Sequence, residues 1–131
     1  MILTNGNIWT AGTAIRQAQR RHLDIPQLGK YRLARLEKDL EKDYRRIESA
    51  RIALIQQHGT ETFSDETQTK SNGWSIQEGT AAHKAYTEAW DALCLETCDV
   101  KVAPIPLAAL GDSANGLELG ELSALGVLIE E

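Results

Sequence analysis

The chain has 131 residues, a length that suits one domain. Hydrophobic residues make up 42% of it and charged residues 25%, which is typical of a globular protein and excludes a collagen-like, low-complexity or wholly disordered chain. The net charge of -5 hides an asymmetry: residues 1–38 carry seven cations and two anions, whereas residues 39–131 carry seven cations and 17 anions. This pattern indicates either an anionic partner for the basic part or basic and acidic faces that meet within the fold or across an oligomer.

Membrane and metal sites are not expected. No stretch approaches the roughly 18–20 apolar residues of a membrane span, and the N-terminal residues lack the basic and apolar blocks of a signal peptide. Cys94 and Cys98 lie too close together to staple distant parts of a fold, which favours a reduced, intracellular setting. The three histidines, His22, His58 and His83, do not have metal-ligand spacing, so we expect no metal and no cofactor.

The first expected element is a short amphipathic helix over residues 5–22. Thr4 and Asn5 are favourable N-cap residues, and apolar side chains recur behind them at helical spacing. Gly12 either costs this helix about 1 kcal/mol or lets another helix pack closely against it. Asp24 and Pro26 then break the pattern, and we expect Asp24 to cap the next helix with Pro26 in its first turn.

A long helix over residues 27–58 is the strongest expectation. Leucine or isoleucine recurs every seven residues along a stripe, and the opposite face is dense with charged side chains. Gly59 follows directly and is expected to end the helix. Such a helix is about 48 Å long at ~1.5 Å per residue, longer than the diameter of roughly 36 Å of a compact domain of this size. We therefore expect either an elongated fold or a homo-oligomer whose interface contains Leu33, Leu36, Leu40, Ile47 and Leu54.

The polar insert over residues 59–79 and the helix over residues 80–97 come next. Asn72-Gly73 is a turn signal, so the insert is either a small β-hairpin, with Phe63 and Trp74 facing each other, or a polar loop. The following helix has one apolar face and is expected to pack antiparallel to the long helix, with Tyr86 and Trp90 as its anchors.

Residues 98–131 are expected to form an extended segment with a short helix. Val100 to Leu107 alternates, and its two prolines suit an edge strand; residues 118–125 have leucines at three-residue steps. The predicted fold class is therefore mainly α: one helical domain over residues 1–131, with an antiparallel helical hairpin built on one long helix, a small β-hairpin or loop insert, and an extended C-terminal segment.

The order of these parts resembles a family. The segments RIALIQQHG, DVKVAPIPLAAL and LELGELSALGVLIEE, separated by a variable insert, resemble an uncharacterised family of small proteins of tailed bacteriophages and prophages. The resemblance covers roughly residues 28–131, and the Trp-containing insert departs from it. It implies a phage accessory role in the cytoplasm of the bacterial host, and it carries no catalytic residues over to this chain.

The sequence contains no catalytic motif, but it does contain a candidate binding site. No phosphate-loop, dinucleotide-binding, zinc-protease or serine-hydrolase signature is present, so we do not expect an enzyme. Both sides of the break near Pro26 carry cations, and arginine suits phosphate recognition. The predicted ligand-binding cluster consists of Arg16, Arg20, Arg21, Lys30, Arg32 and Arg35.

Three functions fit these features. The first is a non-enzymatic phage accessory protein that acts as an oligomeric interaction module, with itself and a host protein, such as a defence protein, as partners. The second is a sponge that sequesters a phosphate-bearing nucleotide signal, an anionic small ligand, at the basic cluster. The third is a virion assembly or scaffolding protein. Duplex nucleic acid is not expected as a partner, because most of the chain is acidic and no groove-reading motif is present.

Overall fold

The computed structural model describes residues 1–21, 24–67, 70–111 and 116–130. It is mainly α, as the sequence predicts. The helices are α1 (Asn5–Gln19), α2 (Gln27–His58), α3 (Ala81–Leu95) and α4 (Leu119–Leu125), with short 3₁₀ helices η1 (Leu107–Leu110) and η2 (Gly126–Leu128). The strands are β1 (Ile2–Thr4), β2 (Thr60–Phe63), β3 (Ser71–Ser75), β4 (Thr97–Asp99), β5 (Ile105–Pro106) and β6 (Ile129–Glu130).

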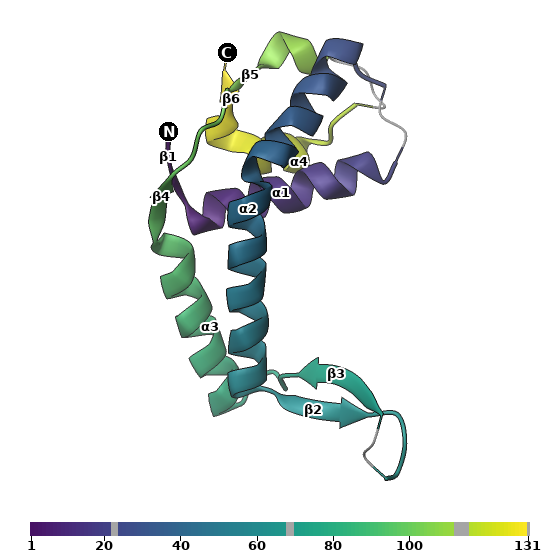
Figure 1. Ribbon diagram of the computed structural model, residues 1–131, viewed down its shortest axis with the longest axis vertical. Helices are drawn as coiled ribbons and strands as arrows, with labels where there is room; N and C mark the ends of the chain where they lie inside the picture. The colour runs from purple at the N-terminus through teal and green to yellow at the C-terminus, as the bar shows by residue number, and fades with distance from the viewer. Residues whose placement is uncertain (22–23, 68–69, 112–115, 131) are drawn as a thin grey trace.

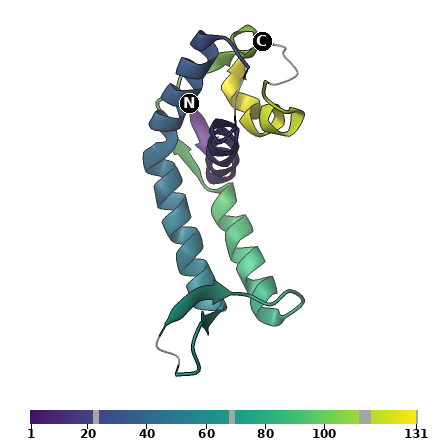
Figure 2. The ribbon, with the colours of Figure 1, turned by 90° about the vertical axis from the view of Figure 1, so that its right-hand side faces the viewer.

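The molecule is elongated and has two regions (Figures 1 and 2). We call residues 48–95 the arm and the remaining described residues the body. In the body, α1 crosses the N-terminal part of α2, and α4 and the C-terminal strands lie beside them. The arm consists of the last part of α2, the β2–β3 hairpin at its tip, and α3, which returns antiparallel to α2 (Figure 1). The antiparallel helical hairpin expected from the sequence is therefore present.

The hydrophobic core lies in the body. Its largest fully buried side chains come from β1, from α1, from α2 and from the segments after β4. None of the 15 residues of α3 is buried, and the last buried residue of α2 is Ile47. The core residues are Leu3, Ile8, Ala11, Ile15, Ala18, Ile25, Leu33, Leu36, Leu40, Tyr44, Ile47, Val100, Ile105, Leu110, Leu125 and Leu128.

Helix α1 begins as predicted and packs closely on α2. The Thr4 hydroxyl accepts a hydrogen bond from the Asn7 backbone N–H at 3.0 Å, and the Asn7 side chain accepts one from the Thr4 N–H, forming a capping box. A Cβ atom on Gly12 would lie 2.4 Å from the Tyr44 ring, so this glycine is what lets the two helices approach. The helix ends at Gln19, and residue 22 of the predicted span lies outside the described residues.

The bounds of α2 match the predicted helix, but its first cap does not. Pro26 itself is the N-cap residue, so Asp24 does not occupy the N-cap position that the sequence suggested for it. Proline fits here because a helix start needs no N–H from it. At the other end Gly59 is the C-cap residue, with φ of -96°. A Cβ atom there would lie 2.5 Å from the Ile55 carbonyl oxygen, which explains the glycine without a left-handed conformation.

The insert is a β-hairpin, although its turn is not where the sequence placed it. Strands β2 and β3 pair antiparallel, with Glu61 opposite Trp74 and Phe63 opposite Ser71. Phe63 and Trp74 are therefore not direct cross-strand partners. Asn72 and Gly73 lie within β3, where Gly73 has φ of +99° next to an irregularity in the register. A glycine tolerates this conformation inside a strand as well as in a turn.

Two short sheets tie distant parts of the chain together in the body. Strand β1, which the sequence analysis did not predict, pairs antiparallel with β4, and the amino group of Met1 forms an ion pair with Asp99 at 3.0 Å. Strand β5 pairs parallel with β6, so the proline-containing segment does lie at a sheet edge. These pairings place β1 and β6, the first and last strands, in the body (Figure 1).

The buried side chain of Asn5 connects the arm to the body. Its amide Nδ2 donates to the Leu93 carbonyl oxygen near the end of α3 at 2.9 Å, and its Oδ1 accepts from the guanidinium of Arg46 on α2 at 2.9 Å. Nearby, Trp9 stacks on Tyr44 and meets Trp90 edge-on, with ring centroids 4.8 Å and 5.6 Å apart. The predicted anchor Trp90 therefore packs on α1 at the base of the arm.

Candidate functional site

The six cations of the predicted cluster separate into three groups. Arg16 and Arg21 face acidic or aromatic groups of this chain, Arg20 and Lys30 are exposed, and Arg32 and Arg35 line a cleft. The structure therefore does not bring all six into one surface. The two possibilities that the sequence left open, an anionic partner or internal neutralisation, apply to different members of the cluster.

Arg16 and Arg21 are held within the body. The guanidinium of Arg16 lies 3.9 Å from the centre of the Tyr44 ring and forms an ion pair with Glu37 at 3.8 Å. Arg21 donates to the Gly116 carbonyl oxygen at 3.0 Å and forms ion pairs with Glu118 and with the buried carboxylate of Glu121. Both arginines thus join helices of the body, and their charge is largely offset there.

Arg20 and Lys30 are surface cations. Neither forms an ion pair with another residue in the described part of the chain, and both are exposed. Arg20 follows α1, whereas Lys30 lies in the first turn of α2. Neither residue lines the cleft that contains Arg32 and Arg35.

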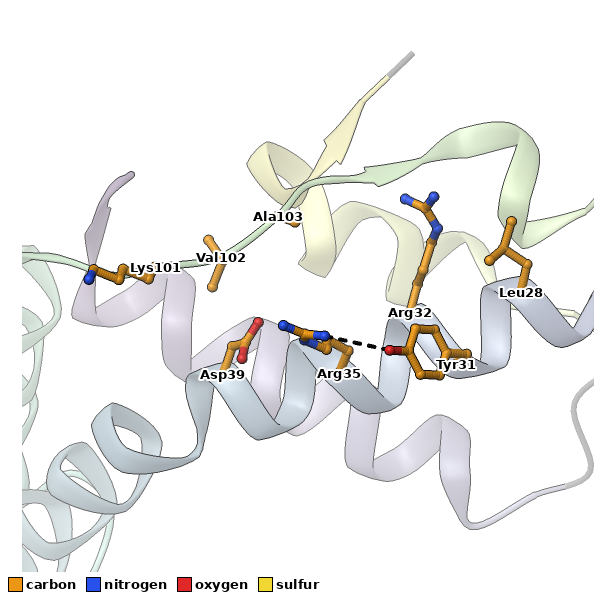
Figure 3. Close-up of a pocket in the computed structure, with 8 residues that line it drawn as sticks. All are labelled: Leu28, Tyr31, Arg32, Arg35, Asp39, Lys101, Val102 and Ala103. Atoms are coloured by element: carbon orange, nitrogen blue, oxygen red, sulfur yellow. Dashed lines mark hydrogen bonds between the residues drawn. The ribbon is translucent and has the colours of Figure 1, made fainter.

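The cleft lies between α2 and the extended segment that joins β4 to β5 (Figure 3). It is open to solvent and has a volume of about 780 Å³, within the range common for small-molecule sites. Arg32 rises from α2 toward the extended segment, and Lys101 lies at the end of the cleft far from Leu28 (Figure 3). The lining residues are Leu28, Tyr31, Arg32, Arg35, Asp39, Lys101, Val102 and Ala103.

The two arginines of the cleft have donors to spare. The Nε atom of Arg32 is buried and makes no hydrogen bond to any described residue. Arg35 donates a long hydrogen bond of 3.5 Å to the Tyr31 hydroxyl (Figure 3). The hydrogen bond to Tyr31, together with the negative charge of Asp39, raises the pKa of the Arg35 guanidinium. The side chain therefore remains a cation at any physiological pH.

Sequence reasoning missed most of the cleft. Tyr31 and Asp39 lie one helical turn from the predicted arginines, a spacing that places them on a shared face. Lys101 and Val102 carried no such signal, because they come from a segment far along the chain that folds back beside α2. Only the three-dimensional structure places them opposite Arg32 and Arg35.

The predicted interface stripe is mostly used inside the chain. Leu33, Leu36, Leu40 and Ile47 are at most 2% exposed because α1 and the C-terminal segments cover them. The expectation that these four contact another subunit is corrected accordingly, since the chain itself already buries them. Leu54, the last member of the stripe, lies in the arm and is half-buried. Of the predicted stripe, only Leu54 remains accessible to another chain.

The arm displays apolar side chains that nothing in the described chain fully covers. Ile52 on α2 is 45% exposed, Trp74 on the hairpin 40%, and Leu95 at the end of α3 76%. On the same two helices, Leu54, Tyr86 and Leu93 are half-buried. The arm is thus a two-helix projection with an incomplete apolar seam.

The described residues include two cysteines but no cluster of possible metal ligands. Cys94 and Cys98 are free thiols, and burial, with the charge of Asp91, raises the pKa of the Cys94 thiol. Among the described residues, no group of three or more histidine, cysteine or acidic side chains has a geometry that holds a metal ion. No helix in the described ranges is both long and apolar enough to cross a bilayer.

Comparisons with known protein families, with curated proteins and with solved structures find no match to this chain.

Proposed function

We propose that the protein is a non-enzymatic interaction module that self-associates through its arm, and that this assembly binds another protein. The observation that carries this proposal is the absence of any buried residue in the 15 residues of α3, in a chain whose body has a well-formed core. Two helices with half-covered apolar faces are stabilised when further helices complete the layer. An accessory role for this module in a bacterial host is part of the same proposal, and it is motivated by the pattern of the sequence alone.

A second copy of the chain is the partner that the arm fits best. A two-fold axis that places α2 of one copy against α3 of the other joins the apolar side chains that each arm leaves exposed or half-buried, because the same seam is present in both copies. The result is a four-helix arrangement of the two arms.

The test is self-association measured by sedimentation over ~1–100 μM, a range that detects dimer dissociation constants near those limits. Ile52→Asp places a charge on an exposed apolar position of α2, so the chain itself should still fold. We expect it to weaken the dimer at least tenfold, since burial of a carboxylate is costly. Gln57→Asp is the matched control, because Gln57 is exposed and lies on a different face of the same helix. A wild type that stays monomeric throughout, or equal weakening by both variants, contradicts the proposal.

A further inference from the structure

We propose that the cleft between α2 and the extended segment 101–103 binds a small organic phosphate, a phosphate group joined to a flat ring as in a nucleotide. This site is separate from the arm and does not depend on self-association. Three cations, Arg32, Arg35 and Lys101, line the cleft together with a single anion, Asp39. The cleft is therefore electropositive in a chain whose net charge is -5.

The buried Nε of Arg32 is the strongest single reason. Among the described residues it is the one buried side-chain nitrogen or oxygen that lacks a hydrogen-bond partner. Buried donors in folded proteins are nearly always satisfied, and an exception calls for a partner. Arg32 reaches from the helix toward the opposite wall of the cleft (Figure 3), and it forms no ion pair with another described residue. Because its Nε is shielded from solvent, an oxyanion in the cleft would accept hydrogen bonds from the terminal nitrogens of the guanidinium.

The second arginine makes a two-point contact possible. Arg35 lies one turn further along the same helix, with one long hydrogen bond to Tyr31 and no ion pair to any described residue. Its planar guanidinium presents paired N–H groups that match two oxygens of a phosphate. By contrast, Arg16 and Arg21 already face acidic groups of this chain, which leaves them poor candidates for the same ligand.

The apolar part of the cleft favours a ring over a bare anion. The Tyr31 side chain is 61% exposed and Leu28 is 54% exposed, and both line the cleft beside Arg32 (Figure 3). An exposed aromatic ring next to an arginine provides a surface on which a flat ring can stack. Inorganic phosphate would leave this surface uncovered, whereas a nucleotide would cover it.

The experiment is calorimetric titration of the full chain at low salt with ADP, pyrophosphate and adenosine as probes. We expect ADP to bind with a micromolar dissociation constant, and pyrophosphate and adenosine each to bind at least tenfold more weakly. Arg35→Gln should weaken ADP binding about tenfold, the loss of one charge-assisted contact. Arg35 is exposed, so this variant should keep its fold. Arg20→Gln removes an equally exposed cation outside the cleft and should leave binding unchanged.

Several results would overturn the site. One is the absence of any binding heat when ADP is titrated up to ~1 mM, which corresponds to negligible affinity. Another is an equal loss of ADP affinity in Arg20→Gln and Arg35→Gln. Equal affinity for pyrophosphate and ADP would overturn the ring-bearing ligand. A poly-glutamate peptide that binds where ADP does not would assign the cleft to an acidic protein segment instead. Titration of Lys101→Gln provides a second check, because this residue lies on the wall opposite α2, and its loss should also weaken ADP binding severalfold.

Discussion

Helix α2 passes through two regions that differ in packing. Between Leu33 and Ile47 its inward-facing apolar side chains are at most 6% exposed, because α1 and the C-terminal segments surround them. From Ile52 to Ile55 the same helix has only α3 and the hairpin beside it, and its apolar side chains are half-buried or exposed. The heptad stripe is therefore divided: Leu33, Leu36, Leu40 and Ile47 build the core of this chain, whereas Leu54 stays half-buried in the arm.

The largest effect that tests this comparison comes from truncating matched leucines in the two regions. Leu40→Ala removes a side chain that is 1% exposed, and we expect it to lower the free energy of unfolding by about 2–5 kcal/mol. Leu54→Ala, on the same helix but half-buried, should cost about 1 kcal/mol, since less apolar area returns to water.

Urea denaturation at low micromolar concentration measures both losses. Low concentration matters because a dimer formed through the arm would add to the apparent stability at Leu54. Equal losses at the two leucines would show that the arm is packed as tightly as the body in the monomer. In that event the division of α2 into two regions fails, and with it the main support for the arm as an interaction surface.

The next largest effect on stability is expected at the close contact between Gly12 of α1 and the Tyr44 ring of α2. Gly12→Ala places a methyl group where the Tyr44 ring now lies, and we expect a net loss of about 1–3 kcal/mol from overpacking. The loss should exceed the gain of about 1 kcal/mol that alanine has over glycine in a helix. Gly120→Ala is the control: it lies in α4, no heavy atom lies within 4 Å of its added Cβ, and the change should be neutral or stabilising. Thermal unfolding of the two variants gives the comparison directly, and a stabilised Gly12→Ala protein would contradict the packing described.

Local sequence patterns explain the elements, whereas contacts between distant segments explain the site. The bounds of α2 follow from an unbroken heptad pattern between Pro26 and Gly59, and the cap of α1 follows from Thr4. The covering of Leu33 to Ile47 does not follow, because it depends on where α1 and the C-terminal segments fold back. The length of the predicted helix indicates an elongated fold or an oligomer, but it does not indicate which part of the stripe stays uncovered.

The same limit applies to the hairpin and the cleft. Asn72-Gly73 is a strong turn signal, yet both residues lie inside β3, where Trp74 pairs with Glu61. Strand register depends on both paired strands, so the local sequence of one strand does not determine it. The cleft needs Lys101 next to α2, and its position follows from the pairing of β4 with β1, which no local pattern indicates. Four of the six predicted cations do not line the cleft, and two of these, Arg16 and Arg21, instead pair with acidic residues of the body.

The smallest expected effect separates a half-buried ion pair of the body from an exposed one on α2. Glu121 is 7% exposed; its carboxylate pairs with Arg21 and also accepts a hydrogen bond from the Glu118 backbone N–H at 2.8 Å. Glu121→Gln keeps the shape but removes the charge, and we expect a loss of about 1–2 kcal/mol, since hydrogen bonds to charged groups contribute more than neutral ones. Glu41→Gln removes the partner of Arg45 in an exposed i,i+4 pair and should cost about 0.5 kcal/mol or less. We would measure the free energy of unfolding by urea denaturation at about 50 mM and about 500 mM salt, because the higher concentration screens exposed charges more strongly. Raising the salt should abolish the loss of stability caused by Glu41→Gln and largely preserve the loss caused by Glu121→Gln. If high salt removes both, the Arg21 pair is as solvent-exposed as the Arg45 pair, and it does not hold α4 against α1.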